Sequence, residues 1–251
     1  METVGVIGST VRRERFYFHM AVACALVAFI GFAPSYWVPM GQGALSKPLF
    51  LHVHGAIFFG WTLLFVYQSW LGVSGQTAKH REIGLLGVAW ATAVAFMAVI
   101  AAYLADHMHL AQGATPNDIA PALAAALGNL AGFVPFIVLA LCNTRRPDVH
   151  KRAMLVATIA LLDAPVVRWL NLLNPPVSLA ERLSVAPLHA ALLADLLFLF
   201  PLIQDWRTRE RPHAVTLVGT LWVVAADVGR FTIGTMPAWQ SLTRAFLSAG
   251  S

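Results

Sequence analysis

Stretches of about twenty mostly apolar residues follow one another along the chain, and they constrain its fold more than any other feature. One of them, HKRAMLVATIALLDAPVVRWL at 150–170, begins with three basic residues and then stays apolar for most of a membrane thickness. A helix of about 20 residues spans the hydrocarbon core of a bilayer. Only 12% of the residues are charged, against about 25% in soluble domains. The sequence therefore predicts an integral membrane protein whose main partner is the lipid bilayer.

We expect an all-α, polytopic membrane protein, built as one domain (1–251) from a bundle of seven transmembrane helices. The spans are expected at 17–38, 49–72, 83–105, 119–142, 152–172, 184–205 and 214–235, with a polar loop at 106–117. The basic segment VRRERF at 11–16 is followed by no small-residue cleavage site, so the first span is expected to stay uncleaved. Gly128 and Gly132 form a GxxxG pattern that predicts close helix packing. The tail 236–251 is mildly amphipathic and is expected at the membrane interface.

Basic residues alternate between the two sides of this predicted bundle. Arginines and lysines occupy the N-terminal segment and the second, fourth and sixth connections, whereas the other connections hold only Lys47 and Arg182. Because basic loops stay in the cytoplasm, the N-terminus is predicted to be cytoplasmic. This topology explains the net charge of +5 without a nucleic-acid partner. Cys24 and Cys142 both lie in apolar runs and are expected to behave as small buried hydrophobes.

Ionisable side chains occur deep inside three of the predicted spans. They are Asp163 and Arg168, Asp195, and Asp227 with Arg230. Lipid cannot solvate such groups, so we expect them to face one another inside the bundle. Asp227 and Arg230 are three residues apart and can pair on one helix face. Arg168 can extend toward Asp195 or Asp163, which leaves one aspartate to be protonated or bound to another group.

Histidines at the ends of the predicted spans suggest a haem site. Two histidines that face each other across a helix bundle can ligate a haem iron, and arginines can pair with the haem propionates. His52 and His54 are about 200° apart on a helix, and His54 is favoured because Trp61 and Gln68 follow on its face. The cofactor-binding candidates are His54, His189, Arg168, Arg230, His52, His80 and His150, with His54 and His189 as ligands of a haem b iron. The leading hypothesis is a haem-b-binding redox protein with a redox partner.

Other interpretations remain open for the same residues. His80 and His150 lie beside basic residues, as interfacial histidines do. The intramembrane set Asp163, Asp195 and Asp227, together with arginine, is also typical of a proton-coupled carrier or binding site for a small molecule. A non-catalytic accessory protein is a third alternative. The sequence has no serine–lysine, HExxH or GxGD pattern that would indicate a protease.

Four segments carry a resemblance to known proteins. At HVHG, KHREIG, RPDVHKRAMLVATI and LLDAPVVRW, the chain resembles an uncharacterised family of multi-pass bacterial inner-membrane proteins, over spans two to six. The placement of its histidines is similar, more distantly, to that of two-haem transmembrane cytochromes b and of haem A synthase. The resemblance implies a location in the bacterial inner membrane. The similarity to the cytochromes b implies that histidines inside the helix bundle bind haem.

Overall fold

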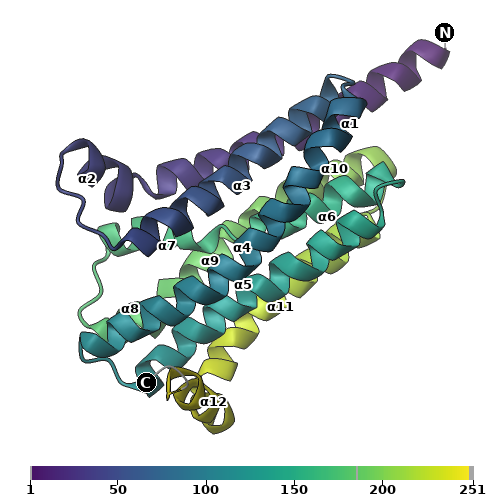
Figure 1. Ribbon diagram of the computed structural model, residues 1–251. Helices are drawn as coiled ribbons and strands as arrows, with labels where there is room; N and C mark the ends of the chain where they lie inside the picture. Colours follow the sequence, from purple (N-terminus) through teal and green to yellow (C-terminus); the bar gives the residue numbers. More distant parts are fainter. Residues whose placement is uncertain (1, 185, 249–251) are drawn as a thin grey trace.

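The chain folds as a bundle of helices that run up and down beside one another (Figure 1). The computed structural model describes residues 2–184 and 186–248, and within these ranges it contains no strand. Within the described residues, six helices or interrupted helices are long and apolar enough to cross a membrane, and the bent pair near the N-terminus makes a seventh if it is one span. The two termini lie at opposite ends of the bundle. The prediction of an all-α, multi-pass membrane fold is confirmed.

The helices have the following bounds in chain order. They are α1 (Glu2–Gly31), the π-helix η1 (Ala33–Trp37), α2 (Val38–Gly41), α3 (Leu49–Val73), α4 (Thr77–Ala111), α5 (Pro116–Cys142), α6 (Pro147–Ile159), α7 (Asp163–Leu173), α8 (Leu179–Ser184), α9 (Ala186–Asp195), the 3-10 helix η2 (Leu196–Phe198), α10 (Leu199–Arg209), α11 (Ala214–Thr235) and α12 (Pro237–Ser248).

The third span differs most from its predicted bounds. It was expected at 83–105, but α4 continues through Ala111 and ends before Gly113, whose φ is 93°. The prediction of a loop from residue 106 was therefore wrong. Hydropathy marks where a helix leaves the apolar part of the membrane, whereas the helix itself ends where a residue can adopt a left-handed conformation. Asp106, His107 and His109 consequently lie on the last turns of a helix.

Prolines interrupt three of the spans. Pro165 lacks an N–H and its ring clashes with the carbonyl four residues earlier, so α6 stops at Ile159 and α7 begins at Asp163. Pro201 lies near the start of α10, just after the 3-10 turn that separates α10 from α9, and it interrupts this span for the same reason. Pro34 lies in the π-helix where the first span bends by 41°. The carbonyl of Ile30 accepts a hydrogen bond from the Trp169 indole N–H at 2.9 Å, which satisfies the group that Pro34 leaves unpaired.

Small residues bring the helices into close contact. An added Cβ at Gly132 would lie 2.8 Å from the Cβ of Ala160, and one at Gly31 would lie 2.2 Å from the Cβ of Pro165. Helix α5 packs against α4, α6, α11 and α12, as the GxxxG pattern predicts. Trp239 on α12 donates its indole N–H to the Ala120 carbonyl at 2.8 Å. The C-terminal segment is therefore a helix held against α5.

Candidate functional site

Arg230 is the centre of a buried polar cluster between α5, α7, α9 and α11. Its side chain is 4% exposed, and its Nη1 lies 3.0 Å from Asp163 Oδ2 and 3.3 Å from Asp227 Oδ1. Asn129 on α5 links the same groups, because its amide donates to Asp163 at 2.9 Å while its carbonyl oxygen accepts from Arg230 at 3.0 Å. The cluster lies beside Gly128, and an added Cβ there would touch the Arg230 side chain at 3.5 Å. One arginine thus joins three helices.

A third carboxyl group, that of Asp195 on α9, completes this cluster. The carboxyl of Asp195 lies within hydrogen-bond contact of that of Asp227, and it also interacts electrostatically with Arg230 and Asp163. The Oδ2 atom of Asp195 is buried and has no hydrogen-bond partner among the described residues. A hydrogen bond between two carboxyl groups requires a proton on one of them. The structure therefore brings together Asp163, Asp195, Asp227 and Arg230, as the sequence predicts.

Arg168 does not pair directly with either aspartate that the sequence suggested. Its guanidinium lies over the Phe32 ring, 3.8 Å from the centroid, and donates to the Ala164 carbonyl on its own helix. It remains near enough to Asp163 for an electrostatic interaction. A guanidinium that stacks on an aromatic ring gains a cation–π interaction, which stabilises its charge where water is excluded. The expectation of a direct Arg168–Asp195 or Arg168–Asp163 contact is corrected accordingly.

The outer histidines lie apart from one another. His54 stacks on Phe58, with ring centroids 4.3 Å apart, and its Nδ1 is buried without a hydrogen-bond partner among the described residues. His52 accepts or donates a 2.8 Å hydrogen bond with the Tyr36 hydroxyl. His189 is exposed. Helix α3, which carries His54, packs mainly against α1 and α4, whereas α9, which carries His189, packs against α7, α8 and α11. The packing does not bring the two predicted axial ligands together.

The inner histidines do meet. The rings of His80 and His150 are in edge contact, with centroids 6.2 Å apart. His150 Nδ1 lies 2.9 Å from the Ala140 carbonyl oxygen and His80 Nδ1 lies 3.2 Å from the Gln68 carbonyl oxygen. An Nδ1–H that donates to a carbonyl leaves Nε2 as an acceptor or ligand, which is the usual arrangement of metal-binding histidines. No group of three or more potential metal ligands occurs within 2–184 and 186–248.

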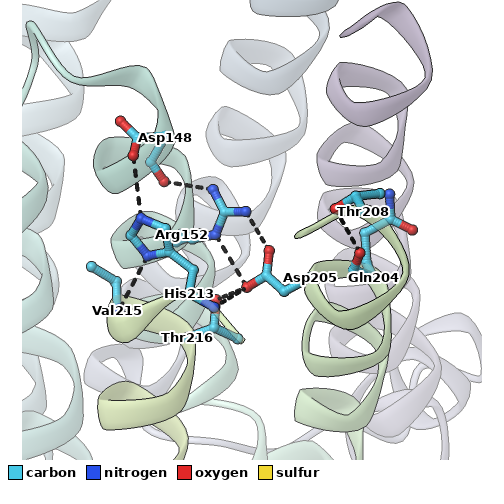
Figure 2. A network of polar contacts seen from close by, with 8 residues as sticks. All are labelled: Asp148, Arg152, Gln204, Asp205, Thr208, His213, Val215 and Thr216. Carbon is cyan, nitrogen blue, oxygen red and sulfur yellow. Dashed lines mark hydrogen bonds and ion pairs between the residues drawn. The ribbon is translucent and has the colours of Figure 1, made fainter. Parts of the chain in front are cut away.

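An ion-pair network ties three helices together (Figure 2), at the end of the bundle where α1 begins (Figure 1). Asp205, which is fully buried, accepts from Arg152 Nε at 3.3 Å and from a second nitrogen of the same guanidinium. It also accepts from the Thr216 hydroxyl at 2.6 Å and from the His213 backbone N–H at 3.1 Å. Arg152 Nη1 donates to the Asp148 carbonyl at 2.8 Å. The pair thereby fastens α6, α10 and the start of α11.

His213 connects this network to the solvent-facing carboxylate of Asp148. Its Nδ1 accepts from the Val215 backbone N–H at 3.1 Å and so caps α11. Its Nε2 therefore carries the proton, which it donates to Asp148 at 3.2 Å. Burial and the charge of Arg152 lower the pKa of His213 below its ordinary value, although Asp148 opposes the shift. The neutral imidazole is the form that fits this cap, because protonation at Nδ1 would remove the acceptor.

Sequence reasoning missed two parts of these sites. Asn129 is an uncharged residue in an apolar span, yet it bridges Asp163 and Arg230. The Arg152–Asp205 pair was not proposed either, because both residues lie near the water boundary of their spans, where basic and acidic residues are common. The available signal was Asp205, an acidic residue that lies at the end of a span and is followed closely by Arg207 and Arg209.

Comparison of the chain with known proteins identifies no relative. No family model matches the chain, and neither a curated protein nor a solved structure is significantly similar to it.

Proposed function

We propose that this protein is a proton-coupled carrier of a small molecule in the bacterial inner membrane. Its proton-binding site is the cluster of Asp163, Asp195, Asp227 and Arg230. The observation that supports the proposal is the buried cluster in which Arg230 is shared between the carboxylates of Asp163 and Asp227 inside the bundle. Intramembrane carboxylates that face the bundle interior mark proton and substrate pathways in membrane proteins.

The charges of the cluster argue for a bound proton. Two carboxylates about 4 Å apart repel by about 4 kcal/mol at an effective dielectric constant of about 20. One proton shared between Asp195 and Asp227 removes this repulsion and leaves a single negative charge on the pair. With Asp163 ionised, the two negative charges balance Arg230 and the nearby Arg168. The cluster is then neutral, as a desolvated site requires.

Release of that proton has a mechanical consequence. Arg230 is shared between Asp163 on α7 and Asp227 on its own helix. A second negative charge on the Asp195–Asp227 pair attracts Arg230 away from Asp163. Asp163 is the first residue of α7, directly after the break in the span at 160–162. Proton binding and the position of α7 are therefore coupled, and a movable half-helix beside an ion site is a common device of transporters.

Uptake into proteoliposomes under an imposed pH gradient tests the proposal. A panel of labelled organic acids, amines and sugars is presented to the wild type and to Asp195→Asn. We expect gradient-driven uptake of at least one compound by the wild type and its loss in Asp195→Asn, with an unchanged elution profile in detergent. Asp148→Asn is the matched control, because that carboxylate is 46% exposed and lies outside the cluster. Equal gradient-driven uptake by wild type and Asp195→Asn would overturn the proposal.

A haem-b-binding redox protein is the second candidate, and the contact between His80 and His150 favours it. His150 Nδ1 lies 2.9 Å from the Ala140 carbonyl oxygen, and the tautomer that donates to this oxygen leaves Nε2 of His150 available as an axial ligand. A haem iron between them would supply one-electron chemistry. The protein purified from haem-replete cells would then have a low-spin Soret band that His80→Ala and His150→Ala abolish and His189→Ala retains. A colourless protein would exclude this candidate.

A further inference from the structure

Three spans of the bundle are interrupted, and their interruptions lie next to one another. The first span bends at η1, the fifth breaks at residues 160–162 between α6 and α7, and the sixth turns through the 3-10 helix η2 between α9 and α10. An added Cβ at Gly31 would overlap Pro165, so the first interruption adjoins the second. Helix α6 packs against η2, and Asp163 at the second interruption interacts electrostatically with Asp195 at the third. Short 3-10 segments inside a helix are common hinge points.

The other spans form a continuous frame. Helices α3, α4, α5 and α11 each run from end to end without a break. The interrupted spans have inner halves α1, α6 and α10, which lie toward the predicted cytoplasmic side, and outer halves η1, α7 and α9. Asp163 and Asp195, which border two of the interruptions, belong to the cluster around Arg230. The interruptions therefore lie at the depth of the proposed proton-binding site.

Polar contacts of Arg152 and Asp205 hold the inner halves together. This pair joins α6 to α10, and the Tyr17 ring on α1 lies 5.5 Å from the Arg152 Cζ. Asp205 also accepts from the Thr216 hydroxyl on α11 at 2.6 Å. A hollow of about 60 Å³ remains between α1, α6 and α10, although protein interiors are otherwise close-packed. Helix α10 is thus fastened to α6 chiefly by the ion pair, beside a space that side chains do not fill.

One face of α11 leads from this ion pair to the cluster. Thr216 and Asp227 are eleven residues apart, which is about three helical turns, so they share a face and lie about 16 Å apart along the axis. Thr216 contacts Asp205, and Asp227 contacts Arg230. Thr220 lies on this face between them and donates to the Thr216 carbonyl. The ion pair therefore lies between the cluster and the predicted cytoplasmic side.

We propose that the Arg152–Asp205 pair is a latch that closes the inner end of the bundle. When the latch opens, α6 and α10 tilt at their interruptions, and the cluster becomes accessible from the cytoplasmic side. The inference rests on the proposed carrier function, because a carrier exposes its binding site to the two sides of the membrane in turn. A buried ion pair has two discrete states, joined and separated, as a gate requires.

Spin-label distances in the full-length protein test whether α10 moves when the latch is weakened. One nitroxide label is placed on the native Cys142, which is exposed at the end of α5, and the other on Arg207→Cys, which is exposed on α10. Cys24 is fully buried and stays unlabelled. A control pair, Cys142 with Arg81→Cys on α4, lies within the continuous frame. Pulsed electron paramagnetic resonance measures both distances.

The latch is weakened in two ways. Asp205→Asn removes its negative charge, and Thr216→Val removes one hydrogen bond from Asp205 with little change of shape. We expect both variants to lengthen and broaden the distance from α5 to α10, Thr216→Val by less, and to leave the frame distance unchanged. Asp148→Asn, which alters an exposed carboxylate, should behave like the wild type. An unchanged distance from α5 to α10 in both variants, or an equal change within the frame, would overturn the proposal.

The reactivity of a cysteine between the latch and the cluster tests whether this movement opens a path. Thr220→Cys is made in a Cys142→Ser background and treated with a water-soluble maleimide. We expect Asp205→Asn to accelerate the reaction at least about tenfold, because loss of the ion pair raises the population of the open state. An unchanged reaction rate would overturn the proposal. Neither measurement involves a substrate, so a failed uptake assay would refute the carrier and leave the latch to be judged on these two results.

Discussion

Replacement of Asp205 by asparagine removes a charge from a buried ion pair, in which the side chains of Arg152 and Asp205 are 7% and 0% exposed. Asp205 is fully buried and receives four hydrogen bonds, two of them from the Arg152 guanidinium. The asparagine has the same shape, but it leaves Arg152 buried without a counter-charge. Removal of one partner from a buried pair costs about 3–5 kcal/mol. For a chain of this length, 1 kcal/mol shifts the melting temperature by about 2–4 °C, so we expect a decrease of about 10 °C.

Thermal denaturation in detergent, followed by loss of the monodisperse elution peak, measures this effect. Asp148→Asn is the matched control, since Asp148 belongs to the same network but its side chain is 46% exposed. Exposed ion pairs contribute about 0–1 kcal/mol, so its melting temperature should stay within about 3 °C of the wild type. An Arg152→Met/Asp205→Leu protein should recover part of the loss, because neither charge remains. A decrease for Asp205→Asn no larger than for Asp148→Asn would refute the reasoning.

Two further predictions concern stability. Because the pKa of His213 is lowered in the fold, the unfolded chain binds more protons near its ordinary pKa of about 6.5, and the stability present above that pH is lost as the pH falls. His213→Asn keeps a cap that does not titrate, so its melting temperature should depend less on pH between about 5 and 7 than that of the wild type; equal slopes would contradict this role. Gly31→Ala should cost about 1–3 kcal/mol, because its Cβ would overlap Pro165, whereas Gly72→Ala, with open space around it, should not destabilise the protein. Comparable melting temperatures for the two variants would show that α1 and α7 are not closely packed.

The sequence predicted the spans well and the contacts less well. Helix α11 has the predicted bounds, 214–235, and Pro165 lies just after the break between α6 and α7. These features are local, because apolar length and proline chemistry act within one segment. The end of α4 was missed because polar residues such as Asp106 can continue a helix beyond the membrane.

Which side chains meet could be predicted only in part. The Asp227–Arg230 pair was found because it lies within one helix. The Asp163–Arg230 and Arg152–Asp205 pairs join residues 67 and 53 positions apart. A span that is apolar on all sides gives little indication of which face turns toward its neighbours. The proposed His54–His189 pair shows the same difficulty, because both residues lie near the predicted outer surface but on helices with different neighbours.

Infrared spectroscopy of the purified protein detects whether Asp195 and Asp227 share a proton. A protonated carboxyl group has a C=O stretching band that an ionised carboxylate lacks. We expect this band at neutral pH in the wild type and in Asp148→Asn, and its loss in Asp195→Asn and in Asp227→Asn. A wild-type spectrum without the band, or a band that survives in both cluster variants, would show that the two carboxyl groups do not share a proton.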